Sequence, residues 1–465
     1  MRYDTVIIGA GLSGLAAGVR LAHYGKKILI LERHYRIGGL SSFYRAGGID
    51  VDVGLHAVTN YNPSGPKSAP MARLLRRLRI RLEDLELFPQ FESRITFPGA
   101  MLRFSNDPEL LSTQVEEVFP GQGENFRKLA RLVDDLYSRD FESGPASARK
   151  IVSSIITEPL LVEMLFCPLM FYGCPQEDDM DFRQFALIFL SVYNEGMARP
   201  RRGIRPLLEL LESRFEASGG ELRTRCGVSR VEVEGGQARA VITDKGERIE
   251  CGAVLSSAGL LETAVICPEV LATRGSTAGG PEPEPGRMSF IESIHALDAP
   301  ARDCGHGFSL NFYSDDEKFI YRRPEEPVNT KSGVICLTGN FDYDKPVDKE
   351  LLRHTQMADP FYWEGLNKEE YATEKKTWRK RSDHSLFTKV PGLAEHSTFL
   401  DMFTPATIKK FTGHINGAVY GAPVKIKDGI TPVENLFICG TDQGYLGIVG
   451  SMVSGVGIAN WHLLK

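Results

Sequence analysis

The stretch that decides the fold is Val6-Ile7-Ile8-Gly9-Ala10-Gly11-Leu12-Ser13-Gly14. A short apolar strand runs directly into a glycine-rich turn, and a helical pattern follows as far as Tyr24. A second apolar run, Ile28 to Leu31, then ends in Glu32. Gly9 allows a tight turn, Gly11 lets the backbone approach a pyrophosphate, and Gly14 lets the helix pack closely on the strand. This order predicts a βαβ unit that binds a dinucleotide, with Glu32 placed to accept hydrogen bonds from a ribose.

The residues after Glu32 indicate which dinucleotide is bound. Arg36 is followed by the glycine pair Gly38 and Gly39. This arrangement resembles the two-dinucleotide-binding-domain flavoproteins, which include amine oxidases, phytoene desaturases and Rab GDP-dissociation inhibitors. The resemblance implies that Arg36 and the glycine pair approach the phosphates and the flavin of FAD, because paired glycines allow close backbone contact and a guanidinium matches phosphate oxygens. Without the glycines, Arg36 would be read as a solvated surface charge.

Composition limits the class of protein. The 465 residues exceed the size of a single core, so we expect two or three domains. A net charge of -5 gives no overall field that would recruit nucleic acid. Eight cysteines without a CxxC pair indicate buried thiols in a reducing compartment rather than a metal site. The first strand starts so close to Met1 that no signal peptide is expected, which favours a cytoplasmic protein.

The predicted fold is α/β. A Rossmann-type, glutathione-reductase-like FAD-binding domain is expected to be discontinuous, with an α+β substrate domain interleaved. We expect residues 1–88, 200–270 and 420–465 in the FAD-binding domain, and residues 89–199 and 271–419 in the substrate domain. The chain returns to the first domain through an apolar strand that ends in Gly440-Thr441-Asp442, before a glycine-studded helix.

Two segments bear on contact with lipids. Residues 151–173 are strongly apolar, but their two prolines and two glutamates argue against a transmembrane helix and leave a lipid-lined pocket or a buried core. Residues 71–82 read MARLLRRLRIRL, with leucines at helical spacing and arginines between them. Such a helix suits an anionic membrane surface, and the alternative is a surface helix with solvated arginines.

The layout of nearly the whole chain resembles the phytoene desaturase family, including its carotenoid isomerase and retinol saturase branches. The segments that carry the resemblance are residues 199–208, 219–258, 404–407 and 440–442, and Arg202 departs from the glycine usual at its position. The resemblance implies contacts with FAD for a larger set of residues. These are Gly9, Gly11, Leu12, Ser13, Gly14, Glu32, Arg33, Arg36, Gly38, Gly39, Leu40, Ser41, Val228, Ser257, Gly440, Asp442, Gly450, Ser451 and Met452.

The resemblance implies desaturation, saturation or flavin-dependent isomerisation of an isoprenoid, carotenoid or other apolar lipid, reached from a peripheral membrane surface. The sequence does not separate these three reactions, because all need the same fold and cofactor. No second GxGxxG suggests a nicotinamide site, so quinone or oxygen is the expected electron acceptor. His56, His414 and Asp401 are the acid–base candidates, and the alternative for each is a hydrogen-bonded structural residue.

Two other functions stay open at this stage. The first is a flavin amine or protoporphyrinogen oxidase of the same superfamily. The second is a non-enzymatic prenyl-lipid escort of the GDP-dissociation-inhibitor type, which keeps the fold without using FAD. The complete glycine motif, Glu32 and Asp442 argue against the escort, since it has no use for an intact dinucleotide site.

Overall fold

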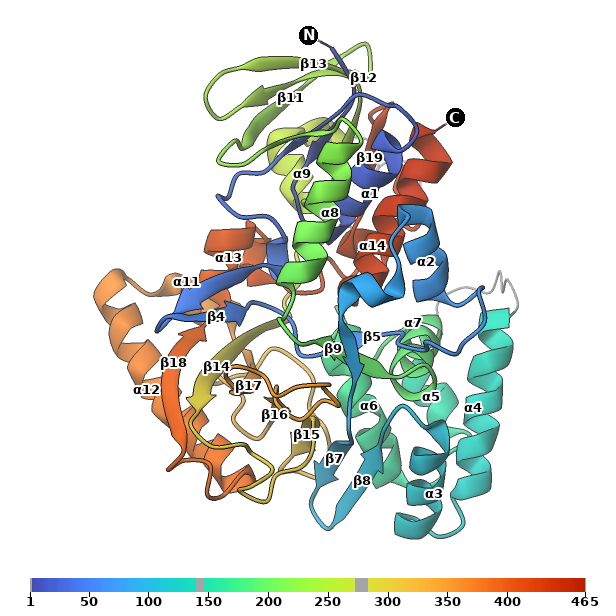
Figure 1. Ribbon diagram of the computed structural model, residues 1–465, viewed down its shortest axis with the longest axis vertical. Helices are drawn as coiled ribbons and strands as arrows, with labels where there is room; N and C mark the ends of the chain where they lie inside the picture. The colour runs from blue at the N-terminus through green and yellow to red at the C-terminus, as the bar shows by residue number, and fades with distance from the viewer. Residues whose placement is uncertain (1, 139–145, 272–282, 465) are drawn as a thin grey trace.

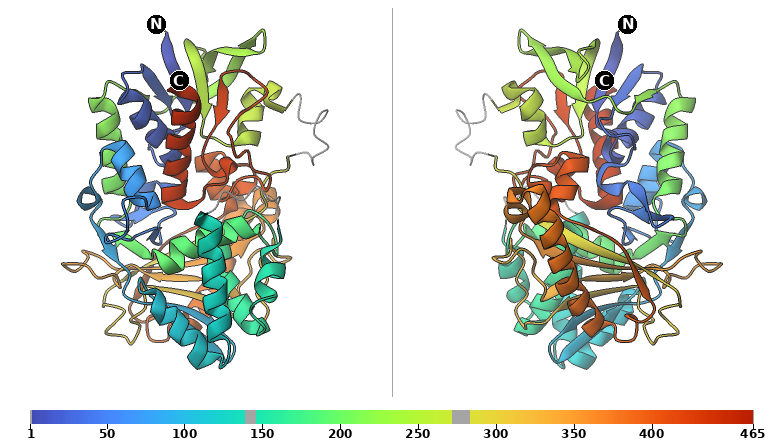
Figure 2. Two further views of the ribbon diagram at one scale, coloured as in Figure 1. Left: turned by 90° about the vertical axis from the view of Figure 1, so that its right-hand side faces the viewer. Right: turned by 90° about the vertical axis from the view of Figure 1, so that its left-hand side faces the viewer.

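The computed structural model describes residues 2–138, 146–271 and 283–464, which form two lobes (Figure 1). The first lobe contains the segments near both chain ends and is built on a mainly parallel sheet. The second lobe is built on a mixed sheet flanked by helices. Figure 2 shows the two lobes stacked along the long axis, with the C-terminal helix beside the first strands.

The first sheet has the strand order β10-β2-β1-β13-β12-β11, and β19 also pairs with β13. Strands β10, β2, β1, β13 and β19 run parallel, while β11 and β12 form an antiparallel extension. The strands are β1 (Tyr3–Ile8), β2 (Ile28–Leu31), β10 (Glu221–Arg223), β11 (Val228–Glu234), β12 (Gln237–Thr243), β13 (Arg248–Ser256) and β19 (Leu436–Ile438).

Strand β1 is buried on both faces, and its side chains alternate between two cores. Ile7 packs on one face with four helices, whereas Val6 and Ile8 pack on the other with the β11–β12 extension and a short helix. The four helices are α1 (Leu12–Ala22), α2 (Pro70–Leu78), α8 (Arg205–Ala217) and α14 (Gly447–Ile458), and the short helix is α9 (Leu260–Ile266). A parallel sheet covered on both faces is the predicted α/β architecture.

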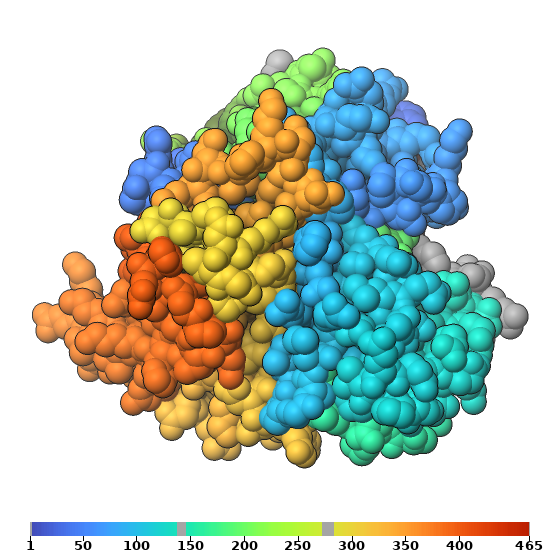
Figure 3. All heavy atoms as spheres, turned by 60° about the horizontal axis from the view of Figure 1, so that its bottom comes forward, coloured from blue at the N-terminus to red at the C-terminus, as the bar shows by residue number. Residues whose placement is uncertain are grey.

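The second sheet has the order β18-β14-β17-β16-β15-β7-β8. Its strands are β7 (Ser93–Phe97), β8 (Ala100–Phe104), β14 (Ser289–Leu297), β15 (Leu310–Ser314), β16 (Ser332–Leu337), β17 (Leu351–Ala358) and β18 (Ser397–Phe403). Figure 3 shows the blue-cyan β7–β8 region side by side with the yellow-orange segments, as the parallel pairing of β15 with β7 requires.

Helices cover both faces of the second sheet. Phe312 of β15 packs into a large core with the helices of one face, and the next residue, Tyr313, packs with Leu386 on the other. The first face carries α3 (Pro108–Val118), α4 (Gly123–Ser138), α5 (Ala148–Ser153), α6 (Pro159–Gly173) and α7 (Phe182–Phe189), and the second carries α12 (Lys368–Lys389). Two further helices are α11 (Pro360–Gly365) and α13 (Pro405–Thr412).

Two small sheets lie where the chain passes between the lobes. Strands β5 (Val58–Thr59), β9 (Met197–Pro200) and β6 (Leu87–Pro89) pair in that order, and β3 (Phe43–Ala46) pairs with β4 (Ile49–Asp52). The first large sheet thus draws strands from three stretches of chain and the second from two. The exact domain boundaries given above stay a prediction.

The two segments singled out for lipid contact take definite forms. The basic helix is shorter than residues 71–82, because α2 ends at Leu78 and Arg79 adopts a left-handed backbone with φ of 56°. The apolar stretch 151–173 forms the end of α5 and the buried α6, which contains Pro168. In the described part of the chain, we find no helix with the length and apolar character needed to cross a membrane.

Candidate functional site

A cavity of about 690 Å³ opens beside the glycine turn, at the carboxyl ends of β1 and β2. This edge of a parallel sheet is where α/β folds bind ligands, and the volume lies in the range of ligand sites. Most residues predicted to contact FAD line it. They are Gly9, Gly11, Leu12, Ser13, Glu32, Arg33, Arg36, Gly38, Gly39, Leu40, Ser41, Val228, Ser257, Gly440 and Ser451.

The glycine turn has the geometry that the motif predicts. Gly9 has φ of 93°, and a Cβ on it would lie 2.6 Å from Ser257 Oγ. A Cβ on Gly14 would lie 2.2 Å from the Gly9 carbonyl oxygen, so the helix needs glycine there to approach the strand. A Cβ on Gly11 would meet nothing within 4 Å, since this residue faces open space. No side chain caps the start of α1, which leaves its first N–H groups available to an anion.

Glu32 is buried at the end of β2. Its Oε2 accepts a hydrogen bond of 2.8 Å from Ala10 N, and its Oε1 accepts one of 2.8 Å from His34 N. These two bonds hold the carboxylate against the glycine turn. Each oxygen keeps lone-pair capacity for a further donor, as a ribose hydroxyl would require.

Arg36 offers an unused donor to the same cavity. Its guanidinium lies 4.5 Å from the Phe43 ring centroid, and its Nε is buried without a hydrogen-bond partner among the described residues. A buried unpaired donor is costly, and a phosphate oxygen would satisfy it. The glycine cradle, Glu32 and this orphaned donor therefore fit the pyrophosphate and ribose of FAD.

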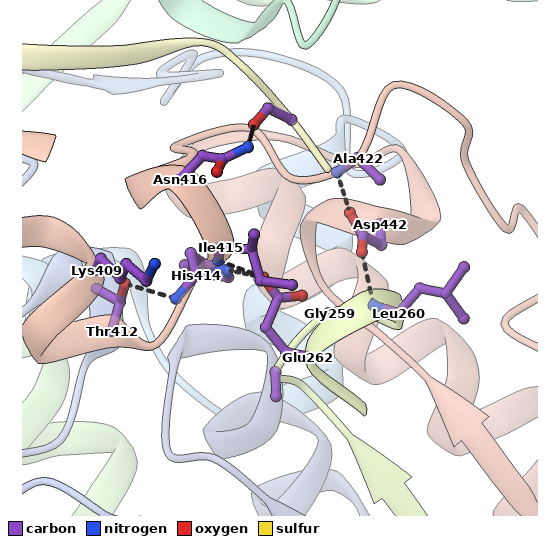
Figure 4. Close-up of polar contacts among 12 residues, drawn as sticks. Gly259, Leu260, Glu262, Lys409, Thr412, His414, Ile415, Asn416, Ala422 and Asp442 are labelled. Atoms are coloured by element: carbon purple, nitrogen blue, oxygen red, sulfur yellow. Dashed lines mark hydrogen bonds and ion pairs between the residues drawn. The ribbon is translucent and has the colours of Figure 1, made fainter. Parts of the chain in front are cut away.

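Four residues predicted to contact FAD do not line the cavity: Gly14, Asp442, Gly450 and Met452. The carboxylate of Asp442 accepts hydrogen bonds from Leu260 N at 2.7 Å and from Ala422 N at 2.8 Å (Figure 4). Lys425 Nζ lies 3.8 Å from the same carboxylate, and burial lowers the pKa of Lys425 to about 8. Asp442 thus joins the start of α9 to the chain near Ala422, and its contact with the cofactor stays a prediction.

His414 lines the cavity next to a carboxylate that sequence reasoning missed. Its Nδ1 lies 3.5 Å from Glu262 Oε1, which also accepts a hydrogen bond of 2.9 Å from Ile415 N (Figure 4). Burial opposes the charge of Glu262, but His414 and the backbone bond outweigh it and lower the pKa of this carboxyl. No sequence signal links residues so far apart.

Asp401 lines the same cavity together with Tyr44, a second residue that the sequence did not suggest. Tyr44 donates a hydrogen bond of 3.1 Å to Asp401 Oδ2, and Lys375 Nζ donates one of 3.2 Å to Oδ1. Burial and the adjacent Asp401 charge raise the pKa of Tyr44. Asp401 is therefore both paired and hydrogen-bonded at the cavity wall.

His56 lies outside this cavity, in the segment that joins the two lobes. Its Nε2 is 3.0 Å from Thr355 Oγ1 and 3.6 Å from Glu292 Oε2. Arg353 pairs with the other oxygen of Glu292. Although burial opposes its charge, Arg353 and His56 lower the pKa of Glu292 to about 2. His56 thus faces an ionised carboxylate, and the three acid–base candidates do not form one cluster.

Two buried arginines hold the backbone next to His56. Arg353 donates to the carbonyl oxygens of Leu55 at 2.9 Å and Val53 at 2.8 Å. Arg199 donates to those of Leu55 at 2.6 Å and His56 at 2.8 Å, and pairs with Asp52 at 2.5 Å. These arginines come from β17 and β9, so a motif search near His56 could not find them.

Comparison with known proteins gives the same picture. The model of the family described as flavin containing amine oxidoreductase matches residues 12–374. An all-trans-retinol 13,14-reductase of Danio rerio is 43% identical, in an alignment that covers 97% of this chain and 84% of that protein. A chloroplastic prolycopene isomerase of Arabidopsis thaliana is 21% identical and covers 97% of this chain and 81% of its own.

Two further matches differ in extent. A phytoene dehydrogenase of Streptomyces griseus is 27% identical over 54% of this chain, and the match spans only 53% of that relative's length. The crystal structure of an oxidoreductase from Methanosarcina mazei superposes with a TM-score of 0.69 at 20% identity, covering 99% of this chain and 100% of that one. The structural match shows that the two proteins share a fold.

Proposed function

The chain belongs to the flavin containing amine oxidoreductase family and is an FAD-dependent oxidoreductase, and from this premise we propose that it acts on a carbon–carbon double bond of an isoprenoid lipid. The observation that carries the proposal is the cavity at the glycine turn, whose buried Glu32 and unpaired Arg36 Nε suit FAD. Similarity across 97% of this chain to proteins named all-trans-retinol 13,14-reductase and prolycopene isomerase supports the lipid substrate.

Among the three reactions, we favour saturation, because the retinol reductase of Danio rerio is 43% identical over an alignment that covers 97% of this chain and 84% of that protein. Saturation adds a hydride and a proton across the double bond and consumes a two-electron reductant. Desaturation would run the other way and pass two electrons to quinone or oxygen. Isomerisation would need reduced flavin without net consumption of electrons.

The roles of the protein's own residues follow from their positions. Bound FAD supplies the site that donates or accepts the hydride. The glycine turn, Glu32 and Arg36 bind the cofactor, and the apolar core around α6 excludes water from the second lobe. We propose His56 as the group that transfers the proton, since its imidazole lies beside the Glu292 carboxylate, outside the cofactor cavity. His414 and Asp401 line the cofactor cavity and are second choices.

We also propose that the protein works in the cytoplasm at a peripheral membrane surface. A lipid substrate of this class dissolves in a bilayer rather than in water, so an enzyme that binds the membrane meets it at high local concentration. The electron partner, quinone or oxygen for desaturation, could be met at the same place.

The other two functions make opposite predictions. An amine or protoporphyrinogen oxidase would turn over a polar amine or a tetrapyrrole with oxygen. A prenyl-lipid escort would bind lipid without holding FAD, which the intact glycine turn and Glu32 argue against.

The test begins with the absorption spectrum of the purified protein and identification of the released cofactor. The FAD-loaded protein is then incubated with all-trans-retinol and prolycopene under reducing conditions, and with phytoene plus a quinone under oxidising ones. Chromatography with mass detection separates a mass gain of two hydrogens from a loss and from an isomer of equal mass. A protein that holds FAD but changes none of these lipids, while oxidising an amine or tetrapyrrole, would overturn the proposal.

A further inference from the structure

A group of arginines without acidic partners lies on the first lobe, on the side of α2. We call it the arginine face and define it as Arg20, Arg73, Arg76, Arg77 and Arg79. None of the five pairs with a carboxylate within the described ranges 2–138, 146–271 and 283–464. The hydrogen bonds of Arg20 and Arg76 go instead to neutral groups, such as Arg20 to Asn460 Oδ1 and Arg76 to the Lys67 carbonyl oxygen.

The packing of α2 explains why the charges gather here. Met71, Leu74, Leu75 and Leu78 are buried in the core shared with α14, so the remaining helix positions face outward. Arg73 and Arg76 are exposed three residues apart on α2, which places them on one side of the helix, and Arg79 is exposed just past its end at Leu78. The leucines are therefore committed to the fold, and only the basic side of α2 is available to a partner.

The cluster carries a local field opposite to the net charge of the chain, which is -5. Burial, and then the charges of Arg73, Arg20 and Arg76, lower the pKa of Arg77. Burial, and then Arg79 and Arg20, lower the pKa of the neighbouring His23 as well. The contributions of the neighbouring arginines agree with the lack of carboxylate partners for these side chains among the described residues.

Two exposed aromatic residues accompany the arginines: Tyr24 contacts Arg20, and Trp461 follows Asn460, which also contacts Arg20. Tyr24 is 57% exposed and Trp461 is 46% exposed. Arg20 connects them, because it donates 3.0 Å to the Tyr24 hydroxyl and 2.8 Å to Asn460, the residue before Trp461. Figure 1 shows α2 beside α1 and α14, with the C-terminus nearby. Tryptophan and tyrosine favour the boundary between lipid and water, where arginines meet phosphate headgroups.

We propose that the arginine face, with Tyr24 and Trp461, docks the protein on an anionic phospholipid surface. The inference rests on the proposed function only in that an apolar substrate gives the enzyme reason to visit a bilayer. An acidic redox protein would also suit the positive charge, but it gives no role to an exposed tryptophan. An anionic lipid surface would contact both the arginine face and the two exposed aromatic residues.

The test measures vesicle binding of the full-length, FAD-loaded protein by sedimentation. One set of vesicles contains phosphatidylcholine alone, and the other replaces one-third of it with phosphatidylserine. We expect binding to the second set only, weakening as salt rises. The variant Arg73→Glu/Arg76→Glu should lose about 25-fold or more in partitioning, at about five-fold for each arginine removed. The matched control Arg239→Glu/Lys245→Glu, two exposed cations of the β12 region, should bind like the native protein.

Tryptophan fluorescence supplies a second readout. Trp363 and Trp378 are only 1% and 4% exposed, so a blue shift on vesicle binding must come from Trp461, and Trp461→Phe should abolish it. Equal loss in the control variant, or binding that ignores phosphatidylserine, would overturn the proposal. Binding to polyaspartate in place of vesicles, without a blue shift, would assign the face to an acidic protein. The flavin spectrum and turnover of detergent-dispersed substrate are recorded alongside, so a failed enzyme assay is not confused with failed docking.

Discussion

At the scale of single residues, the cofactor cavity is lined by Arg36, whose Nε has no hydrogen-bond partner among the described residues. Arg36→Met should weaken FAD binding about 10- to 100-fold, because a hydrogen bond to a charged phosphate contributes about 1.5–3 kcal/mol. Arg36 Nε is buried and unpaired in the protein alone, so its removal should not destabilise the apoprotein. Fluorescence titration of the apoprotein with FAD measures the FAD affinity of this variant and of its control. Arg239→Met is the control, since Arg239 is exposed on β12 and does not line the cavity; equal losses of FAD affinity in the two variants would contradict the assignment.

His56 and His414 separate proton transfer from cofactor binding. His56 lies outside the FAD cavity and His414 lines it. His56→Asn should therefore lower kcat by about 100-fold or more while leaving FAD affinity unchanged, as loss of an acid–base group does. His414→Asn should affect FAD affinity more than kcat. Steady-state kinetics and flavin titration on both variants decide the roles, and the reverse pattern would move the proton to His414.

The buried Glu292 makes stability depend on pH. Its pKa is lowered from 4.5 to about 2, so its contribution to stability is present above pH 4.5 and is lost as pH falls toward 2. The shift corresponds to about 3 kcal/mol. Glu292→Gln should destabilise the protein at pH 7 by about 3–5 kcal/mol, because Arg353 is left buried without its partner. It should also flatten the acid dependence between pH 4.5 and 2. Denaturant unfolding at several pH values measures this. The exposed Glu124→Gln serves as control, and a wild-type pH slope in Glu292→Gln would refute the argument.

At the scale of elements, contact between α1 and α14 depends on glycine. A Cβ on Gly455 would lie 2.0 Å from the Ser13 carbonyl oxygen, and Ser13 lines the FAD cavity. Gly455→Ala should force the helices apart, cost about 1–3 kcal/mol of stability and weaken FAD binding although Gly455 touches no cofactor. Gly457→Ala is the matched control on the same helix, because its Cβ would only reach Trp461 at 3.8 Å. Thermal unfolding and FAD titration compare the two variants. Equal losses of stability and FAD affinity would show that α1 and α14 do not pack closely at Gly455.

Elements were predictable from sequence where the signal is local. The βαβ unit, its glycine turn and Glu32 follow from spacing alone, and all of them meet at one cavity. The end of α2 was not predictable to the residue. The pattern MARLLRRLRIRL continues its leucine spacing to residue 82, but Arg79 turns left-handed and Ile80 enters the core separately. Periodicity reports which residues are buried, and it does not report where the helical backbone stops.

At the scale of the whole molecule, sequence reasoning reaches its limit at contacts between distant segments. The resemblance of nearly the whole chain gave the α/β fold and FAD, and both are confirmed by the family match and the structural neighbours. Glu262 beside His414, Tyr44 beside Asp401 and Arg353 beside Glu292 were not foreseen. Each pair joins residues far apart in the chain, so no spacing or local composition can reveal it. Asp442 had a role by resemblance, yet its carboxylate holds two backbone amides.

The connection between the two lobes also depends on contacts between residues that are far apart in the chain. Segment 53–56 leaves the first lobe and is held by Arg199 of β9, which pairs with Asp52 and bonds two carbonyl oxygens. Asp52 also accepts a hydrogen bond of 2.9 Å from Ile204 N, at the start of α8. The Arg199–Asp52 pair therefore ties α8, the connecting segment and the small β5-β9-β6 sheet to one another. We expect such a buried network to couple the unfolding of the two lobes.

Arg199→Met tests this coupling. It removes three donated hydrogen bonds and leaves Asp52 buried without its cation, which should cost about 3–5 kcal/mol. We expect the native protein to unfold in one calorimetric transition and Arg199→Met to unfold in two, with only the transition of the FAD-binding lobe moving to higher temperature on addition of FAD. Arg202→Met, three residues along and largely exposed, should keep one transition. If Arg199→Met lowers the melting temperature but still unfolds in one step, the network stabilises the lobes without coupling them, and the many other contacts between the lobes carry the cooperativity instead.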